Sequence, residues 1–196
     1  AIFLFSGLVA FNFFSACILT GSKTFFEYHG LIDKVNLPKI LFPVAVVASV
    51  LVDSFLVFIA LLIMMFFLGS PISINLLIVP ISYLALVIFT FGLTLVVSIL
   101  TVFYRDVQQI IPYILQSLFF LSPILYPKTQ FGDGLLSFFI SLNPISVYVE
   151  LFRAPIYEGN LPSLFYFISG FSLSFISLTV GLLFFFKYKH LIIFKL

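Results

Sequence analysis

The chain has 196 residues, of which 63% are hydrophobic and 8% are charged. A soluble domain carries roughly 45 to 50% apolar and about 25% charged residues, so this chain has more apolar side chain than its own interior can bury. Its net charge of +2 comes from nine scattered Lys and Arg residues, which excludes the basic footprint of a nucleic-acid-binding protein. These numbers indicate a membrane protein.

Five apolar stretches are long enough to cross a membrane. A bilayer core of about 30 Å requires about 20 helical residues. Because backbone groups cannot stay unpaired in lipid and the stretches lack strand-like alternation, the spans must be α-helices. The sequence therefore predicts an all-α, polytopic transmembrane helix bundle that forms a single domain over residues 1–196. The predicted spans are residues 1–20, 44–68, 76–103, 110–126 and 163–186.

The first predicted span begins at Ala1, inside an apolar run and without a charged flank. This start resembles neither a signal peptide nor a natural N-terminus, so we expect further sequence before it. The span contains the only cysteine, Cys17, which cannot form an intrachain disulfide and is expected to be a small buried hydrophobe.

The segment 21–43 is too polar to cross a membrane, yet it carries five large apolar side chains within eight positions. A short amphipathic helix here would lie against the membrane surface and present side chains to a cytoplasmic partner. A plain solvated loop is the alternative. The residues that would make such a contact are Phe25, Phe26, Glu27, Tyr28, Leu31, Ile32 and Lys34.

Asp53 is the only acidic residue inside a predicted span. It lies about 15 Å of helical rise from the span's end, where an isolated carboxylate costs at least about 2.5 to 3.5 kcal/mol. Its side chain must therefore face protein or water. It either hydrogen-bonds to Ser49, Ser54 or another helix, or lines a substrate path or a proton relay. Because no second intramembrane acid or base can complete a relay, the hydrogen-bonded carboxyl is favoured.

The distribution of positive charge among the loops predicts the orientation. If segment 21–43 is cytoplasmic, seven of the nine Lys and Arg residues lie inside, and only Lys128 and Arg153 lie outside. The positive-inside rule then places the C-terminus in the cytoplasm. On the same side, a short turn carries Tyr104, Arg105 and Asp106, and taken alone Arg105 and Asp106 would be an ordinary solvated pair.

The outer segment 127–162 contains two apolar pieces that are too short to cross. Residues 135–142 and 145–157 correspond to roughly 12 and 20 Å of helix, which suits a re-entrant or interfacial pair. Asn143 and Pro144 break the helix between them. Glu150 and Arg153 are three positions apart and share one helix face. They either pair with each other, sit at the mouth of a channel, or mark a wet surface.

No catalytic motif is present. The sequence contains no Walker-type phosphate loop, no HExxH or GxSxG motif and no Cys/His cluster with metal-ligand spacing. His29 and His190 have no second ligand nearby in sequence, so neither is expected to bind a metal. We therefore predict that the chain is not an enzyme. The many Phe side chains could stack on sugars along a glycan path, although facing lipid is their default in a membrane helix.

Four stretches are distributed, in order, over the part of the chain from residue 4 to residue 159: LFSGLVAFNFFS, LIDKVNLPKILFPVAVVASVLVDSFLVF, LTVFYRDVQQIIPYILQSLFFLSPILYP and ISLNPISVYVELFRAPIYEG. In order and spacing they resemble the permease subunits of type-2 ABC exporters of lipid-linked polysaccharides such as O-antigen, capsule or teichoic acid. The resemblance implies six spans, with an N-terminal amphipathic helix and a first span missing here. It also implies a bacterial inner-membrane homodimer around a central path.

In such exporters two separate ATPase subunits bind ATP and Mg, so the resemblance implies no cofactor in this chain. The loop after the second span acts as a coupling helix seated in the ATPase, which corresponds here to Phe25 through Lys34. The turn from Phe103 through Asp106 would be a second contact. The outer pair, 135–142 and 144–157, would be a gate that includes Asn143, Pro144, Glu150 and Arg153. The anionic head of the substrate would meet the positive cluster of Lys23, Lys34, Lys39 and Arg105.

Three alternatives stay open. A drug, lipid or haem exporter would have the same permease fold. An intramembrane enzyme would need clustered polar catalytic groups at one membrane face, whereas this sequence has scattered single ones. A scaffold protein would not need two separated inner contacts together with broken outer helices.

Overall fold

The structure is a computed structural model that describes residues 2–32, 37–68, 73–126 and 143–192. Within these ranges every regular element is a helix, which confirms the all-α prediction. The elements are α1 (Ile2–Glu27), α2 (His29–Ile32), α3 (Leu41–Phe67), η1 (Ile74–Ile78), α4 (Val79–Phe103), α5 (Asp106–Leu121), α7 (Pro144–Arg153), η3 (Ala154–Glu158), α8 (Leu164–Tyr188) and η4 (Lys189–Leu191). Here η1 and η4 are 3-10 helices, and η3 is a single π-helical turn.

Four of the described helical segments are long and apolar enough to cross a membrane, and they match the first, second, third and fifth predicted spans. They are Ile2–Glu27, Leu41–Phe67, Ile74–Phe103 and Leu164–Leu191. A chain with several such helices is a multi-pass membrane protein.

The predicted fourth span, 110–126, corresponds to α5, which both begins and ends earlier than predicted. It has 16 residues, and as a straight helix these rise about 24 Å, which is less than the roughly 30 Å of a bilayer core. The helix ends at Leu121 because Pro123 has no N–H with which to continue it. The apolar run continues through Tyr126 without helical structure, which is why hydropathy alone placed the end of the span too late.

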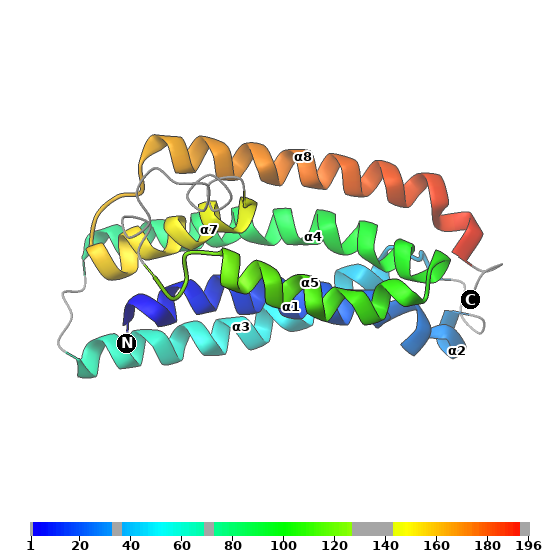
Figure 1. The fold of residues 1–196 in the computed structure, drawn as a ribbon, viewed down its shortest axis with the longest axis horizontal. Coiled ribbons are helices and arrows are strands. Elements are labelled where there is room, and N and C mark those ends of the chain that lie inside the picture. The colour runs from blue at the N-terminus through cyan, green and yellow to red at the C-terminus, as the bar shows by residue number, and fades with distance from the viewer. Residues whose placement is uncertain (1, 33–36, 69–72, 127–142, 193–196) are drawn as a thin grey trace.

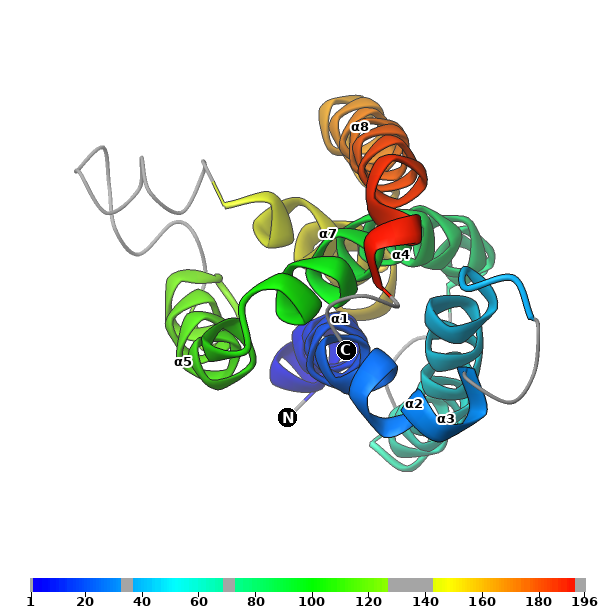
Figure 2. The ribbon, with the colours of Figure 1, turned by 90° about the vertical axis from the view of Figure 1, so that its right-hand side faces the viewer.

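The long helices lie side by side, roughly parallel to the long axis of the molecule (Figure 1). Figure 2 looks along this axis and shows α1 at the centre, with α5 on one side, α3 on another, and α4 between α1 and α8. The central position of α1 explains why its buried residues are not confined to one stripe and include neighbours such as Phe13 and Phe14.

The helices α4 and α8 approach each other backbone to backbone. A Cβ atom built at Gly92 would collide with the backbone of Ser177, and one built at Gly181 would collide with the backbone of Gly92. Two serines of α8 bond across the interface: Ser174 Oγ donates to the Ala85 carbonyl at 2.6 Å, and Ser177 Oγ donates to the Phe89 carbonyl at 2.7 Å. Small residues and hydroxyl bonds of this kind hold membrane helices together. We call this interface the α4–α8 seam.

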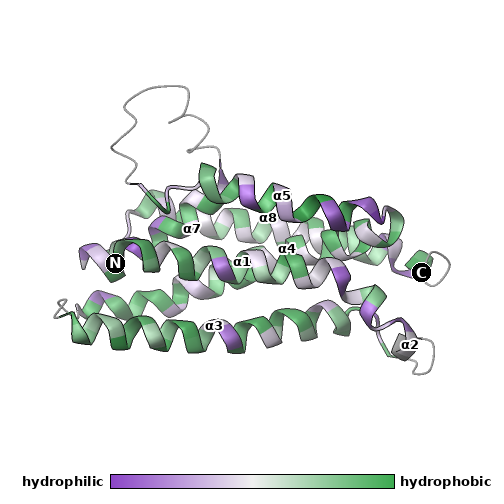
Figure 3. Ribbon diagram, turned by 60° about the horizontal axis from the view of Figure 1, so that its bottom comes forward, coloured by the Kyte–Doolittle hydropathy of each residue, from purple (hydrophilic) through white to green (hydrophobic). Residues whose placement is uncertain are grey.

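The bundle has two distinct ends. At the α2 end lie α2, the turn between α4 and α5, the start of α3 and the end of α8; at the α7 end lie α7, η1 and the start of α8 (Figure 1). Hydrophobic residues cover the helices between these ends, and hydrophilic residues gather toward the α2 end (Figure 3). The described basic residues at the α2 end are Lys23, Lys39, Arg105, Lys187 and Lys189, whereas Arg153 lies at the α7 end. This charge asymmetry agrees with the predicted orientation, in which the α2 end is cytoplasmic.

Candidate functional site

The two segments predicted to contact an ATPase meet at the α2 end. The guanidinium carbon of Arg105 lies 5.5 Å from the centre of the Phe26 ring, which places the cation over the aromatic face. Arg105 reaches this position because α4 ends sharply at Tyr104, whose backbone is extended at φ −133° and ψ 96°. The chain then turns directly into α5, which begins at Asp106. The end of α1 and the α4–α5 turn therefore form one surface, which we call the coupling face.

The coupling face does not contain every residue that the sequence assigned to it. Phe25 is 1% exposed and lies in a small core cluster with Phe42 and Leu95, so it holds α1 within the bundle. The described side chains open to a partner are the half-buried Phe26 and the exposed Glu27, Tyr28, Tyr104, Arg105 and Asp106. Sequence alone could not separate Phe25 from Phe26, because two adjacent phenylalanines satisfy the same amphipathic pattern.

The predicted amphipathic segment is helical in part. Its first residues form the last turn of α1, and after a break at Tyr28 the helix α2 continues through Leu31 and Ile32. Lys34 lies outside the described residues. The observed part of the amphipathic segment is therefore a continuation of α1 with one break, rather than a free loop.

At the α7 end, Asn143 begins α7 and ties it to the segment after α5. Its side-chain Oδ1 accepts a hydrogen bond from the Ile145 N–H at 3.0 Å, and its Nδ2 donates to Ser122 Oγ at 2.9 Å. Pro144 occupies the first helical position, where a missing N–H costs nothing. The predicted helix boundary is therefore where α7 starts. Its bond to Ser122 could not be predicted, although the Ser-Pro and Asn-Pro pairs both signal helix ends.

Arg153 is a buried cation that joins three parts of the chain. It is 3% exposed, and one terminal nitrogen donates to the carbonyls of Pro123 at 2.6 Å and Ile124 at 3.3 Å. Its guanidinium carbon lies 3.8 Å from the centre of the Phe3 ring on α1. Burial lowers the pKa of Arg153, and the nearby Glu150 carboxylate acts in the opposite direction. Arg153 thus holds α7 to α1 and to the unwound end of α5.

The helix α7 is covered by its own chain. Tyr148 is fully buried, and its hydroxyl lies 2.9 Å from the Gly170 carbonyl and 2.8 Å from Ser174 Oγ. Contacts with α1, α4 and α8 shield the rest of the helix. A second subunit is therefore not needed to cover it, which removes one physical reason to expect a homodimer. The other predicted gate piece, 135–142, lies outside the described residues.

Asp53 lines a cavity of about 230 Å³ between α1 and α3. The other polar residues at this cavity are Asn12, Thr20 and Ser54. No described residue donates a hydrogen bond to the Asp53 carboxylate, and the Ser49 hydroxyl donates instead to the Val46 carbonyl at 2.9 Å. The expected bonds to the serines are absent from this part of the chain. What the structure shows is an exposed carboxylate at a mainly apolar cavity that also contains Asn12, Thr20 and Ser54, in the middle of the helices.

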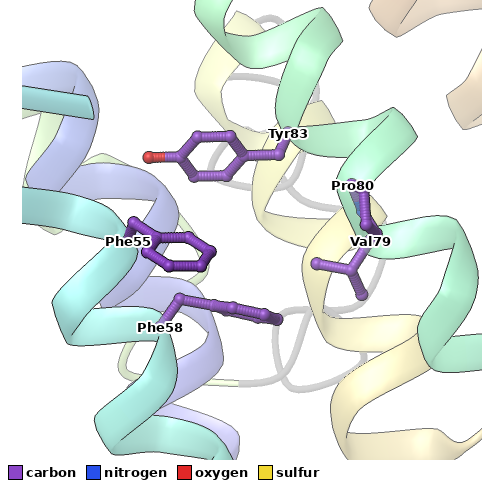
Figure 4. A pocket seen from close by; sticks show the side chains of 5 residues that line it. All are labelled: Phe55, Phe58, Val79, Pro80 and Tyr83. Atoms are coloured by element: carbon purple, nitrogen blue, oxygen red, sulfur yellow. The ribbon is translucent and has the colours of Figure 1, made fainter. Parts of the chain in front are cut away.

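A second cavity, of about 170 Å³, lies between α3 and α4. Figure 4 shows Phe55 and Phe58 of α3 facing Tyr83, Val79 and Pro80 of α4 across this space. Three aromatic rings thus come together at one place. Elsewhere Phe side chains lie on the outside of the bundle, as expected for residues that face lipid. At the end of α3, for example, Phe66 and Phe67 are 73% and 81% exposed.

Comparison with known proteins assigns this architecture to a family. Residues 2–157 match the family model described as "ABC-2 type transporter". The chain is 29% identical over 161 residues to a Myxococcus xanthus protein and 27% identical over 187 residues to a Klebsiella pneumoniae protein, and both are named "O-antigen export system permease protein RfbA". The alignments cover 82% and 91% of this chain, but the chain spans 62% and 70% of these relatives. The chain belongs to the ABC-2 type transporter family, whose membrane domains work with an ATPase partner.

Proposed function

We propose that the chain is the transmembrane subunit of an ATP-driven exporter that moves lipid-linked polysaccharide, of the O-antigen, capsule or teichoic-acid type, across the bacterial inner membrane. The observation that carries this proposal is the similarity to O-antigen export permeases over 82% and 91% of the chain. In this proposal the α2 end and the C-terminus are cytoplasmic. The charge asymmetry between the two ends supports that orientation.

The complete exporter contains two copies of this chain and two ATPase subunits, which bind ATP and Mg. The coupling face docks on the ATPase, and the contact between Arg105 and Phe26 supports this step because it makes the end of α1 and the α4–α5 turn one surface. When ATP draws the two ATPases together, each coupling face is displaced as a unit. Since α1 is the central helix, this displacement reaches α3, α5 and α7 through direct contacts.

The substrate path runs beside α3. Asp53, Asn12 and Thr20 offer hydrogen-bond partners to sugar hydroxyls, and Phe55, Phe58 and Tyr83 offer aromatic faces. The anionic lipid head approaches from the α2 end, where Lys23 and Arg105 are exposed. Gate motion at the α7 end requires the Arg153 bonds to Pro123 and Ile124 to break or to move with α7 as a unit.

A second candidate function is the export of a smaller amphiphile, such as a drug, a lipid or haem, by the same fold. The cavity between α3 and α4 favours this alternative because its lining is almost entirely apolar. A glycan path must instead include polar groups, which the cavity around Asp53 supplies.

The test is ATP hydrolysis by the permease co-purified with its ATPase in proteoliposomes. We expect lipid-linked polysaccharide to stimulate hydrolysis and a hydrophobic drug of similar charge not to. Phe26→Asp should release the ATPase in pull-downs while leaving membrane insertion intact, because it replaces the aromatic ring at the centre of the docking surface by a charge. The matched control is Leu161→Asp, in the segment between η3 and α8 at the α7 end, which is 61% exposed and outside the four membrane-crossing segments and should retain the ATPase. Stimulation by the drug alone, or co-purification unchanged by Phe26→Asp, contradicts the proposal.

A further inference from the structure

A third cavity, of about 340 Å³, lies at the α2 end between the segment that leads into α3 and the end of α8. Its lining combines two kinds of side chain. Lys39, Lys189 and His190 supply basic groups, and Leu37, Phe185 and Phe186 supply apolar walls. No acidic side chain is among the described residues that line it.

Each lysine makes a contact at the cavity, Lys39 with the backbone of Lys189 and Lys189 with the ring of Phe186. Lys39 Nζ donates to the Lys189 carbonyl at 2.8 Å, and Lys189 Nζ lies 4.7 Å from the centre of the Phe186 ring. Burial lowers the pKa of Lys39, and the like charge of Lys189 lowers it further. The two ammonium groups therefore repel each other at the cavity, and an anion bound there would relieve that repulsion.

The position of the cavity specifies the anion. It lies where the membrane-crossing segment Leu164–Leu191 ends, so its apolar walls are level with the edge of the bilayer core and its ammonium groups with the headgroups. A basic pocket between helices at a membrane surface is the form that anionic lipid sites take. A soluble anion would gain nothing from the exposed side chains of Leu37 and Phe186, whereas a lipid's glycerol and acyl carbons would cover them.

We propose that this cavity binds the phosphate of an anionic phospholipid from the surrounding leaflet. The bound lipid contacts Lys39, just before α3, and Lys189, at the end of α8. It therefore connects the start of α3 to the end of α8. This connection adds to the hydrogen bond that Lys39 donates to the Lys189 carbonyl. The inference does not depend on what the exporter carries.

The test is to titrate phosphatidylglycerol into the full purified chain and to measure the fraction of protein with bound lipid by native mass spectrometry. Because a lysine near a membrane surface contributes about 1 kcal/mol, we expect Lys39→Gln and Lys189→Gln each to weaken binding about fivefold and the double variant about 25-fold. Lys39→Arg, which keeps the charge, should retain binding and shows that the site tolerates substitution. The matched control is Lys187→Gln, which removes an exposed lysine two residues from Lys189 that does not line the cavity.

Three results would overturn the proposal. One is equal binding of phosphatidylglycerol by the wild type and by the double variant. Another is an equal loss from Lys187→Gln, which would indicate diffuse surface attraction. The last is displacement of the lipid by an equal concentration of inorganic phosphate, which would identify a site for free phosphate. A retained preference for phosphatidylglycerol over phosphatidylcholine, lost only in the Lys39 and Lys189 variants, supports it.

Discussion

The helices α3 and α8 both lie at the periphery of the bundle, yet they contact it in opposite ways. Similar shares of their most apolar stretches are buried, 28% for α3 and 22% for α8. On α8 the contact is the α4–α8 seam, with glycines at backbone distance and serine hydroxyls bonded across it. On α3 the contacts with α1 and α4 each contain a cavity. The share of a helix that is buried therefore does not reveal how firmly the helix is held.

This difference suggests how the bundle moves. A close-packed seam with little free volume resists relative displacement, so α4 and α8 should move as one body. The cavities between α3 and its two neighbours, α1 and α4, leave room for α3 to shift without opening new voids. Since the polar and aromatic residues of the proposed path line those cavities, the loosely held side is also the side where substrate would pass.

The seam is where substitution should have the largest effect. Gly92→Leu places a side chain against the Ser177 backbone and should destabilise the protein by about 3 kcal/mol, the upper range for overpacking. The yield of folded protein and the midpoint of thermal unfolding in detergent would both fall. The matched control is Gly30→Leu, because nothing described lies within 4 Å of a Cβ at Gly30. If the two variants unfold at the same temperature, the seam is not close-packed.

Arg153→Met tests whether α7, like the α4–α8 pair, is held firmly in the bundle. The substitution keeps apolar volume but leaves the Pro123 and Ile124 carbonyls without their charged donor, so we expect a loss of about 2 kcal/mol in the free energy of unfolding. Lys187→Met is the control, because it removes an exposed cation at the other end of the bundle and should leave the unfolding midpoint unchanged. A midpoint for Arg153→Met equal to that of the control would show that α7 is not anchored by this residue.

Of the three substitutions, Asp53→Asn should have the smallest effect on stability, and we expect it to act on transport alone. The carboxylate is exposed and receives no hydrogen bond from any described residue, so the unfolding midpoint should stay the same. Stimulation of ATP hydrolysis by lipid-linked polysaccharide should fall severalfold if Asp53 lines the path. Thr179→Val is the control: this polar residue of α8 bonds within its own helix, to the Phe175 carbonyl at 2.9 Å, and lines neither cavity beside α3. Full stimulation in Asp53→Asn would remove Asp53 from the path.

The sequence predicted where helices lie along the chain better than it predicted which residues pack against each other. Four membrane-crossing helices and the start of α7 at Pro144 follow from local rules of length, hydropathy and proline geometry. The end of α5 was missed because the apolar run extends past Pro123. The assignment of Phe25 to the core, rather than to the coupling face, depends on its contact with α3 and α4, which no local pattern encodes.

The site residues show the same limit. Lys39 and Lys189 are 150 positions apart, and nothing in the sequence relates them before the fold brings them together. The sequence left open whether Arg153 pairs with Glu150, sits at the mouth of a channel or marks a wet surface, whereas the side chain is buried and donates to carbonyls that follow α5. Residue types predicted which side chains were unusual in a membrane, but their partners come from helix packing.

Distances within one protomer, measured with spin labels, test most directly whether α3 moves against a rigid α4–α8 pair. Labels at Leu56 on α3, Leu84 on α4 and Ile176 on α8 occupy lipid-exposed positions, at 61%, 57% and 57% exposure. On ATP binding by the complete transporter, the distance from Leu56 to Leu84 should change by about 2 to 5 Å, the scale of helix shifts in switching proteins, while the distance from Leu84 to Ile176 stays fixed. A change across the seam with α3 unmoved relative to α4 would contradict the account.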